Sequence, residues 1–273
     1  MRSETSGYKR FGAVLSVFFL LFAVLLAAAE NIWPSADGKK TDANGILKVD
    51  YSHSADGYIM VRGNKTDRRL KLRVSSAGTT LTYDLNSKGE YEVIPLQFGS
   101  GNYKITIYRN VSGKKYSEEG SLSFKFKLND ENAAFLCPNQ FVSYTKDSPA
   151  VKKAQELCAG LKTDLEKFEA IRSFIEHGSA YDFVRAVTVS GTVLPDVDGC
   201  YKKKMGICQD LSALMVCMLR SQGVHTKLMI GYAGENYHAW VAVILDGSDK
   251  MYDPTAALGG IGKNVKYSLE RFY

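Results

Sequence analysis

Close metal-binding spacings are absent from this sequence. Its four histidines and five cysteines include no C-x-x-C or H-x-x-x-H pair, the kind of spacing on which zinc sites depend. We therefore expect no metal and no cofactor. A concentrated positive charge is also missing, because the net charge is only +6 and the lysines and arginines are spread along the 273 residues. This excludes a nucleic-acid partner, and we interpret Lys202–Lys204 as a solvated surface loop.

The first 29 residues have the pattern of a targeting segment. Arg2, Lys9 and Arg10 precede an apolar run at 11–29 that ends in "LLAAAE". This arrangement predicts a secretory signal cleaved after Ala29. The alternative is an uncleaved membrane anchor, because the run approaches the roughly 20 residues that span a bilayer. No cysteine lies near the cleavage point, so we expect no lipid anchor there. Either way we expect residues 30–273 to be secreted or displayed at the cell surface.

Export makes disulfide bonds possible. The odd number of cysteines leaves at least one thiol unpaired within the chain. Cys217, within the apolar run "LSALMVCMLR", is expected to be a buried, inert thiol. Cys137, Cys158 and Cys200 could include one bridge, and the sequence does not choose the pair.

Residues 46–128 alternate apolar and polar side chains with a period of two. Turns that contain Gly, Asn or Ser separate seven such segments: "LKVDY", "YIMVR", "LKLRV", "LTYDL", "YEVIPL", "YKITIY" and "LSFKFKL". Short strands at this spacing predict an antiparallel, Ig-like β-sandwich, which we place at residues 30–130. We find no cluster of His, Cys or acidic residues in it, so we expect it to position or display something.

Residues 131–273 are predicted to form a second, α+β domain. Helices are expected after Pro149, after Thr163 with Glu166 completing a capping box, and at Cys208–Arg220. A loop is expected from Ser179 to Gly206. Strands follow in "TKLMIGYA", "HAWVAVIL" and "KMYDPT".

Cys208, His238 and Asp253 form a candidate catalytic triad. Cys208 begins a predicted helix, where unpaired N–H groups and the helix dipole favour a thiolate. His238 begins one strand and Asp253 ends the next, so that pairing of the strands would bring them together. Gly206 is expected to allow a sharp turn and the approach of a substrate.

Plainer interpretations remain open at this point. A cysteine at a helix start is usually structural, and a disulfide between Cys200 and Cys208 would silence the site. Spacing alone does not separate these alternatives.

The wider text "KKMGICQDLSALMVCMLRSQGVHTKLMIGYAGENYHAWVAVIL", followed by "MYDPT", resembles the core of the transglutaminase-like superfamily. The resemblance covers roughly residues 150–260 and rests on a G-x-C helix start, a G-Y strand, an H-A-W strand and a D-P-T turn in that order. It implies a papain-like thiol fold with Cys208 as nucleophile, His238 as general base and acid, and Asp253 as the orienting carboxylate. It is also similar to exported bacterial members with a sandwich domain ahead of the catalytic core.

Two departures limit what the resemblance implies. Animal-type members use an upstream tryptophan as oxyanion donor, but Trp33 and Trp240 do not lie at that position. We expect the N–H of Cys208 to supply one donor and name Tyr181 as candidate for the second, although simple packing of Tyr181 against the helix is an equal alternative. We also expect no large C-terminal substrate domain and no calcium requirement.

The expected activity is attack on amide bonds of a protein or peptide substrate through a thioester. Hydrolysis, by a protease or amidase, fits better than transfer to an amine. Cell-wall-associated material is among the candidate substrates, and membrane contact is expected only through a retained N-terminal segment. The alternative is a non-catalytic surface module that binds glycan, peptide or protein.

Overall fold

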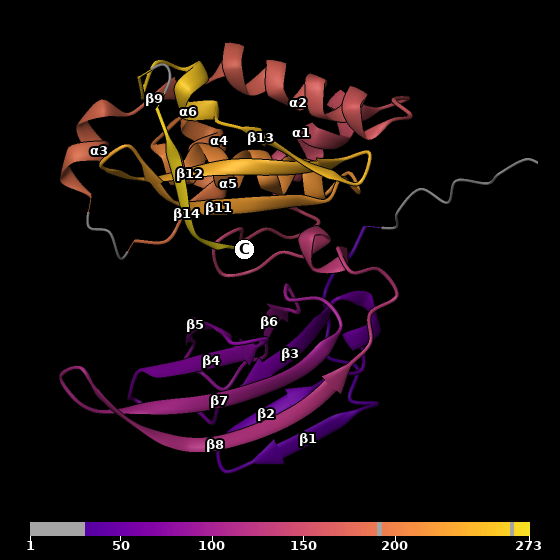
Figure 1. The fold of residues 1–273 in the computed structure, drawn as a ribbon, viewed down its shortest axis with the longest axis vertical. Coiled ribbons are helices and arrows are strands. Elements are labelled where there is room, and N and C mark those ends of the chain that lie inside the picture. The colour runs from indigo at the N-terminus through magenta and orange to yellow at the C-terminus, as the bar shows by residue number, and fades with distance from the viewer. Residues whose placement is uncertain (1–30, 190–192, 263–264) are drawn as a thin grey trace, which may run out of the picture.

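The computed structural model describes residues 31–189, 193–262 and 265–273. The predicted signal segment at 1–29 lies outside these residues. The chain is arranged in two halves, with strands β1 to β8 in one and the helices and strands β9 to β14 in the other (Figure 1). Within the described residues, no helix combines the length and the apolar character that crossing a bilayer would require.

The first half consists of two four-stranded antiparallel sheets. One sheet has the strand order β1-β2-β3-β6 and the other β5-β4-β7-β8. The strands are β1 (Thr41–Asn44), β2 (Leu47–Asp50), β3 (Tyr58–Arg62), β4 (Leu70–Ser76), β5 (Thr79–Leu85), β6 (Glu92–Pro95), β7 (Gly101–Ser112) and β8 (Lys115–Phe126), with a 3-10 turn, η1, at Ser54–Asp56. The predicted antiparallel sandwich is confirmed.

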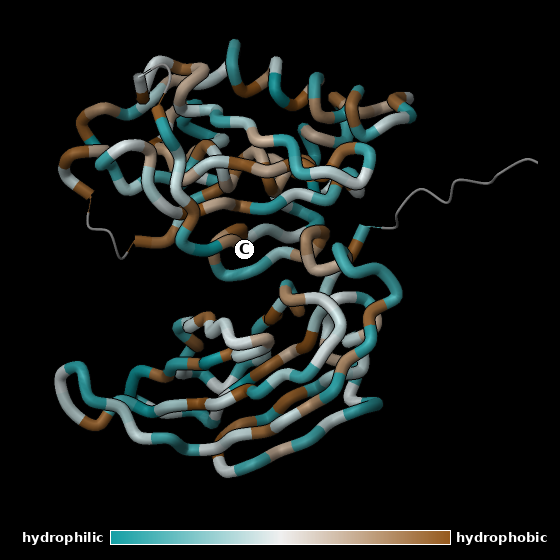
Figure 2. Tube along the Cα trace, in the orientation of Figure 1, coloured by the Kyte–Doolittle hydropathy of each residue, from teal (hydrophilic) through white to brown (hydrophobic). Residues whose placement is uncertain are grey.

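Alternation of side chains builds this sandwich core. In β4 the leucines at 70 and 72 and Val74 are buried, while the residues between them are at least partly exposed. Figure 2 shows the same alternation of hydrophobic and hydrophilic residues along the strands of this half. Each of the seven segments predicted as strands overlaps one of β2 to β8. Strand β1 was not predicted, because all four of its residues are exposed and their sequence has no apolar alternation.

The second half places helices against a four-stranded antiparallel sheet of order β13-β12-β11-β14. Helix α5 packs on this sheet, and α1, α2 and α4 pack on α5. The elements are η2 (Ala133–Leu136), α1 (Pro149–Cys158), α2 (Asp164–Gly178), β9 (Ala180–Tyr181), α3 (Phe183–Thr188), α4 (Val197–Lys203), β10 (Met205–Gly206), α5 (Cys208–Arg220), β11 (Thr226–Ala233), β12 (Asn236–Leu245), β13 (Ser248–Tyr252), α6 (Pro254–Ala257) and β14 (Tyr267–Phe272). The expected α+β class is confirmed.

The loop expected from Ser179 to Gly206 is wrong for most of the described part of that segment. It contains the short helices α3 and α4, and the two-residue strands β9 and β10 pair in parallel. Asp182 and Asp196 cap the two helices by accepting bonds from main-chain N–H groups. Both helices have at most seven residues, too few to display the apolar periodicity on which the sequence prediction depended.

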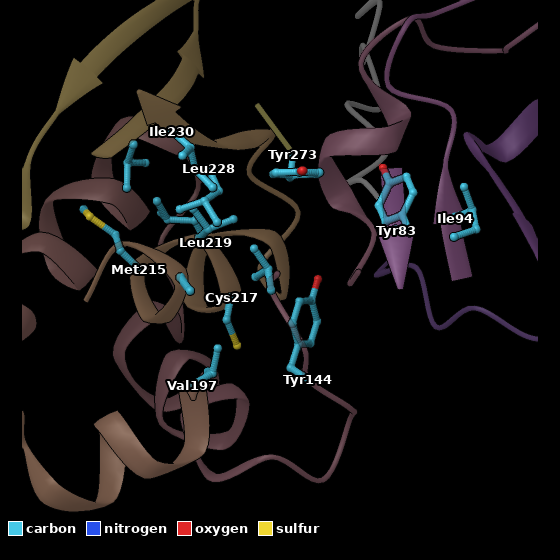
Figure 3. Close-up of a cluster of buried hydrophobic side chains, with 14 of the residues drawn as sticks. Tyr83, Ile94, Tyr144, Val197, Met215, Cys217, Leu219, Leu228, Ile230 and Tyr273 are labelled. Atoms are coloured by element: carbon cyan, nitrogen blue, oxygen red, sulfur yellow. The ribbon is translucent and has the colours of Figure 1, made fainter. Parts of the chain in front are cut away.

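Aromatic residues join the two halves, and a buried arginine fixes Tyr273 within the second half. Phe141 stacks on Tyr273 with 3.8 Å between ring centroids, and Tyr83 of β5 packs edge-on against the same Tyr273. Figure 3 shows Tyr83 and Tyr273 beside the buried side chains of α5. Arg220 is fully buried and donates to the main-chain oxygens of Cys137, Thr226 and Tyr273, at 2.6, 2.8 and 2.7 Å. The relative position of the halves is therefore held by specific contacts.

Candidate active site

Cys208 lies at the first position of helix α5. The preceding residue, Ile207, is extended, with φ −89° and ψ 179°, so the chain enters the helix directly from strand β10. Within the described part of the chain, no acceptor bonds the main-chain N–H of Cys208. This donor is one of the free N–H groups that a helix start leaves available.

Cys208 differs from the other cysteines in its exposure. It is partly exposed, whereas the other four are buried, and all five are free thiols. Neither a bridge among Cys137, Cys158 and Cys200 nor one between Cys200 and Cys208 is formed. Burial raises the pKa of Cys137 and of Cys200 to about 12 and also raises those of Cys158 and Cys217. Because the reactive form of cysteine is the thiolate, these four are poor nucleophiles.

His238 and Asp253 lie side by side across two paired strands. In the register of β12 and β13, Val241 pairs with Tyr252, which places Asp253 at the end of β13 beside the start of β12. Nε2 of His238 is 2.8 Å from Oδ2 of Asp253, and both side chains are about 5% exposed. Since Asp253 occupies Nε2, Nδ1 is the ring nitrogen left for another partner.

The imidazole is held in its protonated form by two neighbours. Burial by itself would lower the pKa of His238, but hydrogen bonds to Asp253 and Cys208 outweigh it and raise the pKa to about 9. The structure thus brings His238 and Asp253 into direct hydrogen-bond contact and places Cys208 with His238 at the same cavity. This arrangement can pass a proton between sulfur and imidazole while the carboxylate fixes the ring.

Every oxygen of Asp253 is engaged. Oδ1 accepts from the main-chain N–H groups of Thr255 and Ala256, which form the start of α6. Oδ2 accepts from His238 and also from the hydroxyl of Tyr267, at 2.6 Å. Sequence reasoning missed Tyr267, which belongs to no motif and comes from β14, two strands away from β12 in the sheet order.

A second carboxylate stabilises the nucleophile's helix. Asp210 is fully buried, accepts a 3.1 Å bond from the N–H of Ile207 and forms an ion pair with Arg185 of α3. Its other oxygen accepts from the N–H of Asp196 at 3.2 Å. Asp210 was also missed, although an acidic residue at the third helix position is a recognisable capping signal.

The interpretation of Gly206 needs correction. A Cβ at this position would lie 2.8 Å from Sγ of Cys200 and 2.9 Å from Cβ of Asp210. Glycine is therefore required by packing inside the protein, on the side of buried side chains, and not to admit a substrate.

Tyr181 lies in β9, paired in parallel with Gly206 of β10. It is partly buried, and burial together with the nearby Cys208 and Asp253 raises its pKa to about 12. Its ring packs edge-on against Phe183, with centroids 4.9 Å apart. These contacts place Tyr181 next to the site, and they leave its expected role as an oxyanion donor a prediction.

A cavity of about 270 Å³ opens at the cysteine and the histidine. Val193–Pro195 and Gln209 line one side, while Tyr237 and Arg271 line another. Thr82 and Asp84 of β5 in the first half also line the cavity, together with Gln140 and Phe141 from the segment after η2. Across the described ranges, no group of three or more His, Cys, Asp or Glu side chains could hold a metal ion.

Comparison with known proteins identifies the second half. Residues 151–251 match the core of the Transglutaminase-like superfamily, and no curated protein matches the sequence. Among solved structures, a candidate cysteine protease from Cytophaga hutchinsonii is 12% identical with a TM-score of 0.40, covering 79% of this chain and 78% of that one. The periplasmic domain of TgpA from Pseudomonas aeruginosa is also 12% identical, with a TM-score of 0.39 and coverages of 71% and 91%. Red sea bream transglutaminase is 14% identical, with a TM-score of 0.28 and coverages of 72% and 48%.

The matched segment includes Cys208 and His238 and ends two residues before Asp253. Residues 151–251 therefore form a transglutaminase-like core domain.

Proposed function

We propose that this protein is a thiol enzyme that acts on amide bonds of proteins or peptides through Cys208, His238 and Asp253. The observation that supports this most directly is the buried hydrogen bond between His238 and Asp253. It lies beside Cys208, which is partly exposed whereas the other four cysteines are buried. The match of residues 151–251 to the core of the Transglutaminase-like superfamily supports the same class of chemistry.

In the proposed reaction the Cys208 sulfur attacks the carbonyl carbon of an amide and forms a C–S bond. The carbonyl electron pair moves to the oxygen, and the free N–H of Cys208 is available to bind that oxyanion. Collapse of the intermediate breaks the C–N bond, while His238 gives its proton to the departing nitrogen. The products of this half-reaction are an amine and a thioester on Cys208.

The second half-reaction resolves the thioester. His238 takes a proton from water as the water oxygen attacks the acyl carbon, and the C–S bond then breaks. This releases a carboxylic acid and regenerates the Cys208 thiolate beside protonated His238. A primary amine would give a new amide by the same route. We favour hydrolysis, and we also propose export by way of the N-terminal segment and a protein or peptide substrate outside the cytoplasm.

The test is alkylation of the purified protein with iodoacetamide at mildly acidic pH. An activated Cys208 is modified first, whereas Cys208→Ala abolishes both fast labelling and turnover of a peptide library and retains its fold. Incubation of the library with and without an added amine, read by mass spectrometry, separates cleavage, deamidation and crosslinking. Full turnover by Cys208→Ala would end the proposal. Slow alkylation with no turnover would support a binding module.

A further inference from the structure

The cavity at Cys208 continues into a longer groove between the two halves. A second cavity, of about 670 Å³, shares Thr82, Phe141 and Arg271 with the first. It follows strand β5 from Thr79 to Thr82 on one side and strand β14 from Leu269 to Phe272 on the other. The groove therefore leads away from the candidate nucleophile along a strand of the sandwich.

Strand β5 is an edge strand, because it has only β4 as neighbour in its sheet. At Asp84 both main-chain groups point away from β4: the N–H donates to Oε1 of Gln140 at 3.2 Å, and the C=O accepts from Nε2 of Gln140. In an antiparallel strand the direction of these groups repeats every second residue. The N–H and C=O of Thr82 and Thr80 consequently point to the same outer edge.

These outer groups lack partners. Within the described ranges, no main chain or side chain hydrogen-bonds the outer N–H or C=O of Thr82 or Thr80. Thr82 lines both cavities. The strand is nevertheless firmly held. The side chains of Leu81, Tyr83 and Leu85 point to the face opposite those of Thr80 and Thr82 and are buried in the core.

Gln140 shows what fits this edge. Its side-chain amide makes the paired donor and acceptor bonds that one residue of a neighbouring strand would make. The next main-chain pair along β5, at Thr82, faces the groove beside Cys208. Exposed edge strands bind extended peptides through such main-chain bonds, with little dependence on sequence.

We propose that an extended polypeptide substrate pairs with the outer edge of β5 at Thr82 and Thr80, and that this pairing guides its amide groups to Cys208. The inference rests on the proposed function and adds a substrate class, unfolded or extended protein segments. The sandwich then contributes directly to substrate binding, and Gln140 marks the end of the available edge next to the cavity.

The test uses Cys208→Ala protein and fluorescein-labelled casein, an unfolded polypeptide, with binding measured by anisotropy. Adding Thr82→Pro removes the outward N–H, and proline is compatible with an edge strand at a position whose N–H faces outward. We expect it to raise the Kd about tenfold. Thr82→Val is the matched control, because it keeps the N–H and the branched shape, and we expect a Kd within about twofold.

A second measurement leaves the protein unchanged, in case Thr82→Pro impairs folding. Synthetic casein fragments N-methylated at successive residues should lose affinity at alternate positions, since only every second N–H of the ligand would face β5. Uniform losses, equal binding by Thr82→Pro and Thr82→Val, or no casein binding at all would overturn the inference. The single variant Thr82→Pro, which keeps Cys208, tests the two proposals separately. Fast alkylation of Cys208 in this variant would show that the catalytic proposal stands independently of the binding proposal.

Discussion

Tyr267 donates a hydrogen bond to Oδ2 of Asp253, the same oxygen that accepts from His238. One carboxylate oxygen is thus shared by a phenol and an imidazole from different strands. Although burial acts in the opposite direction, the bonds from His238 and Tyr267 lower the pKa of Asp253. We therefore infer that Tyr267 is a positioning residue, which would act on the proposed reaction through Asp253.

Replacing Tyr267 with phenylalanine removes one donor from a buried carboxylate. We expect kcat/KM to fall about tenfold and the free energy of unfolding to fall by about 2 kcal/mol, the scale of a hydrogen bond to a charged group. Because Asp253 then becomes a stronger acceptor for His238, the alkaline limb of the pH–rate profile should move to higher pH. A purely structural role would leave that limb in place. The matched control is Tyr232→Phe on the adjacent strand, for which we expect neither change.

The pH dependence follows from the raised pKa of His238. The imidazolium must be present to protonate the leaving nitrogen, so kcat/KM should fall about tenfold per pH unit above pH 9. The free energy of unfolding should also fall as the pH rises. The folded-state pKa exceeds the unfolded value of 6.5, so the contribution of charged His238 is complete below pH 6.5 and is lost as the pH rises through about 9.

Urea unfolding of the wild type and of His238→Gln between pH 6 and pH 10 measures this contribution. The difference in unfolding free energy should shrink as the pH rises across that interval. A constant difference would contradict the proposed charge state.

At acid pH, the lowered pKa of Asp253 predicts that the contribution of its carboxylate to the free energy of unfolding is present above pH 3.8 and disappears below it.

Removing Arg185 and removing Asp210 from their ion pair at the start of α5 should lower the free energy of unfolding by different amounts. Asp210 is about 1% exposed, whereas the Arg185 side chain is 33% exposed. Arg185→Met leaves a buried carboxylate without its cation and should cost about 3 kcal/mol of unfolding free energy. Asp210→Asn leaves an arginine that water can reach, so its cost should be smaller. The double variant should recover part of the loss, as measured by urea unfolding; simple additivity would contradict the coupling.

Gly206→Ala should disturb both packing and reactivity. The new methyl group would overlap Sγ of Cys200 and Cβ of Asp210, an overpacking that typically costs about 1–3 kcal/mol. Because Gly206 lies two residues before Cys208, we also expect slower alkylation by iodoacetamide. The double variant with Cys200→Ala removes one of the two overlaps and should be more stable than Gly206→Ala alone. Equal stability would show that the sulfur is not the obstacle.

Local signals predicted much of this fold correctly. Helix α5 begins at Cys208 and ends at Arg220 as expected, and Thr163 forms its capping box with Glu166. Alternation located seven strands of the sandwich, as in β4 and β5, where every second side chain is buried. These features are encoded within single segments, where periodicity and capping residues act over a few neighbours.

Features that depend on sheet order were not predictable. Tyr267 reaches Asp253 because β14 pairs with β11 and not with β13, the strand directly before it in sequence. The wall that β5 adds to the cavity depends on how the two halves pack, and no motif records that. Arg185 approaches Asp210 from a six-residue helix whose sequence has no recognisable stripe.

The buried guanidinium of Arg220 has a mechanical consequence. It donates hydrogen bonds to Cys137 just after η2, to Thr226 at the start of β11 and to Tyr273 directly after β14, and so fastens them to the end of the helix that Cys208 begins. Any movement that separated these segments would strip acceptors from a charge that water does not reach. Because Phe141 and Arg271, which line the groove, lie close in sequence to Cys137 and Tyr273, this wall of the groove is held in place relative to Cys208.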